Sequence, residues 1–83
     1  MKKERNLIGD KVKQARTNCI PKITQNDLLA RLEIRGIILN ETAISKIEAK
    51  TRPVTDIELV AIAASLDVTV NWLLGIKDVA SHT

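Results

Sequence analysis

The chain has 83 residues, which is enough for one domain. We therefore expect a single domain over residues 1–83, with its core over about residues 6–75 and a tail over residues 76–83. Apolar residues at 45%, charged residues at 28% and a net charge of +3 exclude wholesale disorder. Cys19 is the only cysteine, which excludes an internal disulfide, and no apolar run approaches the roughly 18 residues of a membrane span. We therefore expect a cytoplasmic protein with no membrane partner.

Apolar residues recur at helical spacing in almost every segment, and no strand-like alternation persists, so the fold class we expect is all-α. In the first segment, one helical face carries Ile8, Val12, Ala15 and Cys19. Pro21 closes this segment, because proline cannot continue a helix. The pattern predicts a first helix over about residues 6–18.

The later helices share a start signal: an apolar residue, a residue that caps a helix, and an apolar residue five positions after the first. The signal occurs four times, at Ile23-Thr24 with Leu28, Leu39-Asn40 with Ile44, Val54-Thr55 with Leu59, and Val68-Thr69 with Leu73. An acid three residues after Thr24 and after Thr55 completes a capping box at each. These signals predict four further helices.

Stop signals complete the prediction. Gly36 and Gly75 suit the left-handed position after a helix, and Pro53 follows the third helix. The expected helices therefore cover about 24–35, 40–50, 55–66 and 69–74. The fourth has two apolar stripes and little polar face, so we expect it to be the buried centre of the domain; the stripes are Leu59, Ile62, Ala63 and Leu66, and Ile57, Val60, Ala61 and Ala64.

The charge is unevenly distributed along the chain. Residues 1–52 hold twelve Lys or Arg and six Asp or Glu, whereas residues 53–83 hold one Lys and four Asp or Glu. A basic front half attached to an acidic back half is compatible with a polyanion bound on one side, although a randomly charged surface explains the charges equally well.

Two short helices and a basic segment directly after them form the physical outline of a helix-turn-helix DNA reader. The sequence resembles the phage lambda repressor and Cro type of regulator, often called Xre-like. The residues that carry the resemblance are Arg16, Thr24-Gln25-x-x-Leu28, Ile44-Ser45-Lys46-Ile47-Glu48, Glu58-Leu59-x-x-Ile62-Ala63-x-x-Leu66 and Val68-x-x-x-Trp72-Leu73-Leu74. It covers the chain from about Ile8 to Gly75 and implies a compact five-helix domain of the lambda repressor type.

One segment departs from that pattern. Between Leu32 and Asn40 the chain has about five extra residues, including the apolar run Ile37-Ile38-Leu39. We expect either a second helix extended by about a turn or a longer loop packed on the core. The approach angle of the reading helix depends on which of the two forms.

The resemblance implies a set of contacts to duplex DNA. Phosphate contacts would come from Thr24, Gln25, Lys50, Thr51 and Arg52, and base edges would face Glu41, Thr42, Ser45 and Lys46, with Asn40 capping the reading helix. Lys46 can donate to guanine O6 and N7, and Glu41 can accept from cytosine N4. The resemblance also implies an ion pair between Arg16 and Glu48.

Several of these residues have a plainer interpretation. Thr24 and Asn40 are capping residues whatever the function. Lys46, Lys50 and Arg52 would be solvated charges on an anonymous helix, and Glu41 would favour the positive end of the helix dipole without touching a base. Trp72 fits a core anchor better than a dimer contact, although the resemblance implies a homodimer whose interface includes Trp72, Leu73 and Ile76.

Other chemistry finds little support. His82 and Cys19 are the only His and Cys, which leaves no zinc site and no nucleophilic pair, so we expect neither an enzyme nor a metal or other cofactor. No glycine-rich phosphate loop is present, no small-molecule ligand is evident, and a single aromatic residue disfavours single-stranded nucleic acid.

The expected function is sequence-specific binding of double-stranded DNA by a transcriptional regulator, a repressor that acts by occupying its operator. The alternative is a protein-interaction module, such as an antitoxin-like partner, whose DNA binding is secondary.

Overall fold

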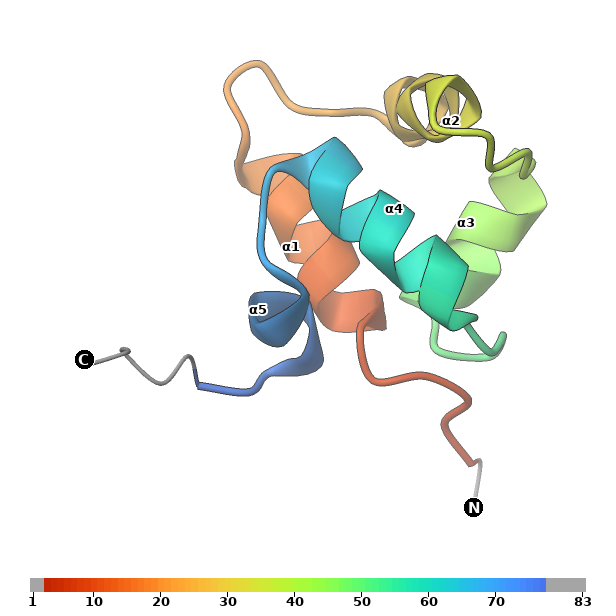
Figure 1. The fold of residues 1–83 in the computed structure, drawn as a ribbon, viewed down its shortest axis with the longest axis vertical. Coiled ribbons are helices and arrows are strands. Elements are labelled where there is room, and N and C mark those ends of the chain that lie inside the picture. The colour runs from red at the N-terminus through yellow and green to blue at the C-terminus, as the bar shows by residue number, and fades with distance from the viewer. Residues whose placement is uncertain (1–2, 78–83) are drawn as a thin grey trace.

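The computed structural model describes residues 3–77, so residues 78–83 of the expected tail, with His82, lie outside the described part. The described chain forms five helices (Figure 1): α1 (Gly9–Asn18), α2 (Gln25–Ile34), α3 (Glu41–Glu48), α4 (Asp56–Leu66) and α5 (Val70–Leu74). The all-α class expected from the sequence is confirmed, and residues 3–77 contain no strand. None of these helices is long and apolar enough to cross a membrane.

The four start signals mark the four later helices. Thr24, Asn40, Thr55 and Thr69 are the N-cap residues, and each side chain accepts a hydrogen bond from a backbone N–H in the first turn. Both predicted capping boxes, at Thr24 and Thr55, are present. These bonds satisfy N–H groups that have no partner within the helix, which explains why the starts were predictable from local sequence.

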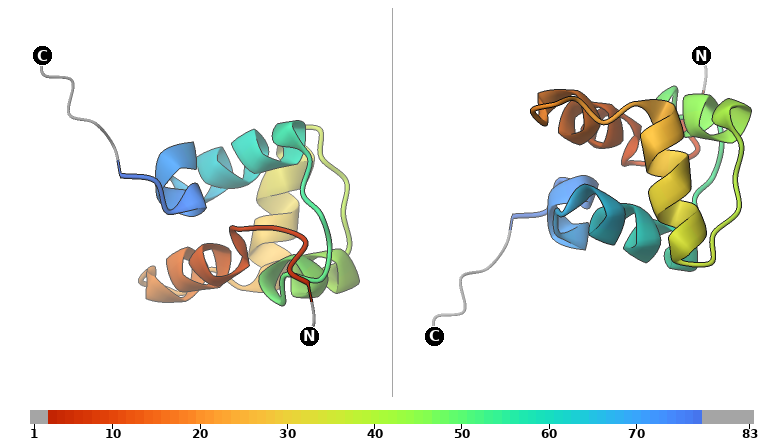
Figure 2. Two further views of the ribbon diagram at one scale, coloured as in Figure 1. Left: turned by 90° about the horizontal axis from the view of Figure 1, so that it is seen from below. Right: turned by 90° about the horizontal axis from the view of Figure 1, so that it is seen from above.

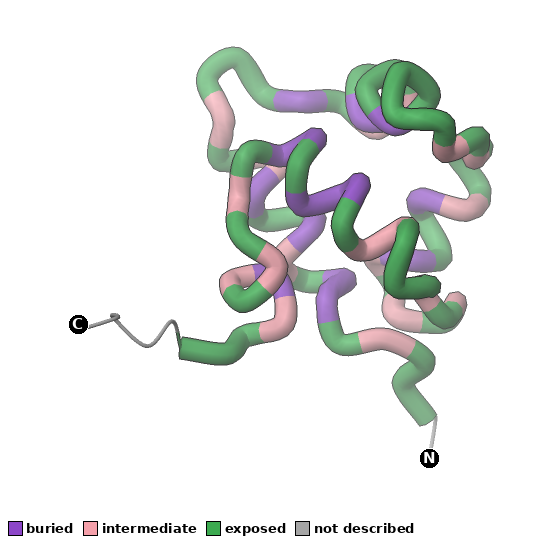
Figure 3. The backbone as a smooth tube through the Cα atoms, viewed as in Figure 1, coloured by how far each residue is buried: buried purple, intermediate pink, exposed green. Residues whose placement is uncertain are grey.

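Helix α2 runs across the domain and connects its two sides (Figure 2). The N-terminal end of α2 lies beside α1 and α3, and its C-terminal end lies beside α4. α5 packs against both α1 and α4. The enclosed core appears as buried segments on the facing sides of the helices (Figure 3); its fully buried side chains are Ile8, Val12, Leu28, Leu32, Ile44, Ile47, Ile62 and Leu73.

Two predicted helix boundaries were wrong. The first helix begins at Gly9, not near Asn6, because Asn6 lies before the helix and its side-chain oxygen accepts hydrogen bonds from the backbone N–H groups of Ile8 and Gly9 at 3.0 and 2.9 Å. The third helix ends at Glu48, before the expected residue 50, because Lys50 adopts a left-handed conformation with φ 64°. That conformation turns the chain out of the helix before Pro53 is reached.

The extra residues before α3 form a loop rather than an added helical turn. α2 stops at Ile34, and Gly36 takes a left-handed conformation with φ 86°. From there Ile37 and Leu39 pack against the core, while Ile38 points outward and is exposed. Of the two alternatives, the loop packed on the core is therefore the one that forms.

The prediction that α4 is buried all round was also wrong. The stripe containing Ile62, Ala63 and Leu66 faces the core. Within the second stripe Ala61 is buried, but Ile57 is 68% exposed and Val60 is 59% exposed. α4 thus packs against its neighbours with one face and leaves an apolar face in solvent.

Candidate nucleic-acid interface

The outer face of α3 carries the side chains expected to meet base edges. Ile44 and Ile47 are fully buried and fix the inner face of this helix against the core. On the opposite face the exposed residues are Glu41, Thr42, Ser45 and Lys46. Positions one, two, five and six of an eight-residue helix share one side, so the four side chains form one surface. The Asn40 side-chain oxygen caps the start of this helix by accepting from the backbone N–H of Ala43 at 2.8 Å.

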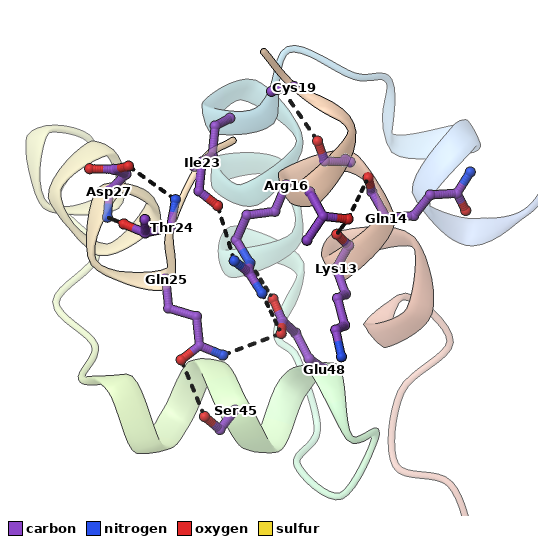
Figure 4. A network of polar contacts seen from close by, with 12 residues as sticks. Lys13, Gln14, Arg16, Cys19, Ile23, Thr24, Gln25, Asp27, Ser45 and Glu48 are labelled. Atoms are coloured by element: carbon purple, nitrogen blue, oxygen red, sulfur yellow. Dashed lines mark hydrogen bonds and ion pairs between the residues drawn. The ribbon is translucent and has the colours of Figure 1, made fainter. Parts of the chain in front are cut away.

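A polar network fixes α3 against α1 and α2 (Figure 4). The ion pair expected between Arg16 and Glu48 is present and two-pronged: Nε donates to Oε2 at 2.8 Å and Nη2 to Oε1 at 3.1 Å. Arg16 Nη1 also donates to the carbonyl oxygen of Ile23 at 3.0 Å. The two charged side chains are only 12% and 7% exposed, so solvent screens the pair weakly.

The same network reaches the expected DNA contacts on α2 and α3. Gln25 Nε2 donates to Oε1 of Glu48 at 3.3 Å, and Ser45 Oγ donates to Oε1 of Gln25 at 3.4 Å. Figure 4 shows Gln25 lying between α2 and α3, with its amide toward Glu48 and Ser45. Gln25 therefore holds the start of α2 in register with the outer face of α3.

Thr24 acts as the cap of α2, as expected. Its hydroxyl accepts from the backbone N–H of Asp27, and the Asp27 carboxylate accepts from the backbone N–H of Thr24, both at 3.0 Å. The backbone and side-chain hydrogen bonds of Thr24 hold the pKa of Asp27 below its usual value. A negative charge thus stays at the start of α2 at neutral pH.

The basic segment after α3 is engaged in ion pairs within the protein. Lys50 Nζ lies 2.7 Å from Oδ2 of Asp10 and 3.1 Å from Oε2 of Glu4, and these two carboxylates raise the pKa of Lys50. Thr51 donates from its hydroxyl to the carbonyl oxygen of Lys46. The sequence predicted Lys50 as a phosphate contact and gave no sign of these ion pairs, because the acids come from residues 40 or more positions away, which a local pattern does not reveal.

Arg52 is paired as well. Its Nη1 and Nη2 donate to Oε1 and Oε2 of Glu58, both at 3.1 Å. This two-pronged contact lowers the pKa of Glu58 and raises the pKa of Arg52. Lys46, by contrast, forms no ion pair within residues 3–77, which makes it the free cation on the outer face of α3.

Sequence reasoning missed Asn6, which holds the start of the chain against the end of α3. Its side-chain amide donates to the carbonyl oxygens of Ile47 at 3.1 Å and Arg52 at 2.8 Å, while its oxygen caps α1. The signal that could have found it is local: asparagine shortly before an apolar helix is a common capping residue.

The residues expected at a dimer interface lie at α5. Leu73 is fully buried within the protein and has no surface to offer a second copy, so that assignment is corrected to a core residue. Trp72 is half-buried, packs against the core and has Lys11 Nζ 4.6 Å from its ring centre. Ile76 is 55% exposed and is the only large exposed apolar side chain among residues 70–77.

The residues 3–77 contain no group of three His, Cys, Asp or Glu side chains that could hold a metal ion. In comparisons with known proteins, no family model, no curated protein and no solved structure matches this chain.

Proposed function

We propose that this protein binds duplex DNA sequence-specifically as an Xre-like helix-turn-helix regulator and represses transcription by occupying its operator. The observation that carries the proposal is the outer face of α3: four adjacent exposed polar side chains, Lys46 among them, on a helix whose other face is anchored by Ile44 and Ile47. A helix held this way can enter a major groove without rearranging the core.

The supporting geometry is the polar network behind that face. Arg16, Glu48 and Gln25 fix the position of α3 relative to the start of α2. A helix N-terminus favours a phosphate, and here the Asp27 carboxylate of the capping box lies at the same end and opposes it. Positioning by phosphates and reading by a groove helix are separate tasks, and we assign them to the start of α2 and to α3 respectively.

The ion pairs of Lys50 and Arg52 change the roles expected for the basic residues in DNA binding. Lys50 and Arg52 are each neutralised by carboxylates of the same chain, so their contribution to phosphate binding is reduced by competition with those partners. Lys46 has no such competitor within the described residues, and we assign it the leading role in base recognition.

Replacing Lys46 by alanine is expected to weaken binding to the preferred duplex by about 1–3 kcal/mol and to relax the preference at one or two base pairs. The measurement is a set of binding titrations on the preferred duplex and its single-base variants. Lys13→Ala, which removes an exposed lysine from α1, is the control and should leave the preference unchanged. An equal loss on every single-base variant for Lys46→Ala would place this side chain on the backbone instead of in the groove.

Replacing Arg52 by alanine is expected to weaken binding about uniformly across sequences and to reduce the salt slope of binding by less than about one unit, because Arg52 is partly neutralised by Glu58. Glu58→Gln is the matched variant: it removes the competing carboxylate, so binding should tighten equally on all duplexes. Titrations at several salt concentrations give both slopes. A change of base preference in either variant contradicts the assignment to phosphate.

The second candidate, a protein-interaction module with secondary DNA binding, is favoured by the ion pairing of Lys50 and Arg52, which lowers the positive charge available to DNA. An electrophoretic shift of random genomic fragments at low salt separates the two. Retarded fragments support the DNA-binding regulator, whereas no shift at any protein concentration supports the interaction module.

We further propose that the protein acts on its operator as a homodimer, because symmetric pairs double the contact area and match two half-sites. The number of protomers bound per preferred duplex, measured by sedimentation, tests this. A single protomer on a site without symmetry contradicts it.

A further inference from the structure

The largest exposed apolar side chains of residues 54–66 are Ile57 and Val60 on α4, and Ala64 is exposed on the same side of this helix. Ile57, Val60, Ala61 and Ala64 occupy positions i, i+3, i+4 and i+7 of one helix, which form a single stripe. This stripe and Ile37 from the loop before α3 line a shallow groove. We call this surface the α4 groove.

A negatively charged and a positively charged side chain lie toward the two ends of the α4 groove. Asp56 lies at the first residue of α4, and Arg35 lies at the end of α2, where it lines the groove and also a second hollow beside Ala64. Asp56 and Ala64 are eight residues apart, which is about 12 Å along a helix. The anion and the cation therefore flank the apolar stripe toward opposite ends.

Both charges are available to a partner. Neither Arg35 nor Asp56 forms an ion pair with another of the residues 3–77, and both are exposed. Among the described residues, the Asp56 carboxylate accepts from the backbone N–H of Ile57 alone, at 2.7 Å. Of the other charged residues packed nearby, Arg52 is engaged with Glu58 and Arg31 with the carbonyl oxygen of Ser65. Asp67 lies in the same hollow as Arg35 and Ala64.

From this geometry we propose that the α4 groove is a surface for pairing with a second copy of this chain, with the two α4 helices antiparallel about a two-fold axis near Val60. In that arrangement Asp56 of each copy lies beside Ala64 of the other and meets its Arg35, so both ion pairs form at once. Ile57 and Val60 pack across the axis, and the small exposed side chain of Ala64 allows the helices to approach closely.

Such pairing leaves the candidate nucleic-acid interface open. That interface lies at α3 and the N-terminal end of α2, whereas the α4 groove lies at the C-terminal end of α2, about 15 Å away along a ten-residue helix. The groove also offers more exposed apolar surface than α5, where Leu73 is buried. The inference deepens the proposed homodimer, but association is measured on the free protein, so its failure and that of DNA binding are distinguishable.

The test is sedimentation equilibrium of the full chain from about 1 to about 300 µM, a range that covers weak to moderate association. The parent protein should form a dimer. Arg35→Asp and Asp56→Arg should each raise the dissociation constant by about tenfold or more, because each places like charges together twice. An equimolar mixture of these two variants should restore dimers, since both contacts are then attractive.

Two further variants complete the experiment. Val60→Glu places a charge at the centre of the groove and should abolish pairing without depending on the terminal ion pairs. Ile20→Glu changes an exposed apolar residue far from the groove in sequence, is the control, and should pair like the parent. Circular dichroism checks that each variant is folded. A monomeric parent, a charge-swapped mixture that stays monomeric, or a Val60→Glu variant that still pairs would overturn the proposal.

Discussion

Replacing Gly9 by alanine is expected to lower the free energy of unfolding by about 3 kcal/mol, because overpacking a tight contact forces backbone shifts. Gly9 is the first residue of α1 and lies directly against the end of α3. A Cβ atom at this position would overlap the carbonyl oxygen of Ile47 and would lie 2.8 Å from that of Glu48. Neither oxygen belongs to a side chain that can rotate away, so α1 and α3 would have to separate.

Urea unfolding monitored by circular dichroism measures this loss. Lys13→Ala, an exposed position on the same helix, is the control and should change the free energy of unfolding by less than about 0.5 kcal/mol. An unfolding midpoint of Gly9→Ala equal to that of the parent would show that the two helices do not pack as closely as described.

Replacing Glu48 by alanine is expected to cost about 3 kcal/mol, since it leaves the nearly buried guanidinium of Arg16 without its partner. Arg16→Ala should cost a similar amount, and the double variant less than the sum of the two. Thermal unfolding of the parent, the two single variants and the double variant completes a double-mutant cycle. Asp10→Ala, which breaks the exposed contact to Lys50, is the matched control and should cost only about 0–1 kcal/mol.

Replacing Gln25 tests the positioning of α3 separately from the burial of Arg16. Glu48 accepts a hydrogen bond from Gln25, which in turn accepts from Ser45 on the outer face of α3. Gln25→Ala removes that link without exposing a buried charge, so it should leave stability nearly unchanged while loosening the register of α3. A loss of stability as large as that of Glu48→Ala would show that Gln25 has a mainly structural role.

The helix starts were predictable because their causes lie within four residues of each other. Thr24 with Asp27 and Thr55 with Glu58 form reciprocal hydrogen bonds that depend on local spacing alone. The start of α1 was not predicted, because Asn6, whose side chain caps it, lies three residues before Gly9 and is held in place by carbonyl oxygens of Ile47 and Arg52. Those partners are more than 40 residues away in the sequence.

Helix α4 shows a second limit of prediction from sequence, which concerns the face that a helix buries. Both of its stripes are apolar, so periodicity could not decide which faces the core. Packing decides it: the side with Ile62 and Leu66 meets the neighbouring helices, and the side with Ile57 and Val60 remains in solvent. An all-round apolar helix was interpreted as buried, whereas in this chain the excess apolar face is a surface.

Among the candidate DNA contacts, some features were predictable from the sequence and others were not. The exposed face of α3 follows from the positions of Ile44 and Ile47, which the sequence pattern contains. The neutralisation of Lys50 by Asp10 and Glu4 depends on α1 meeting the end of α3, a tertiary contact that charge counting along the chain does not reveal. The basic front half of the sequence therefore overstates the positive charge that the folded protein offers.

Binding to a selected duplex tests whether this protein recognises a DNA sequence. The full chain is used to select duplexes from a random-sequence pool, and its affinity for the selected duplex is compared with that for a scrambled duplex of the same composition, over a series of salt concentrations. We predict at least about 10³-fold tighter binding to the selected duplex at physiological salt, with both affinities falling as salt rises. Equal affinity for the two duplexes at every salt concentration, or no binding at the lowest, would rule out sequence-specific binding of duplex DNA.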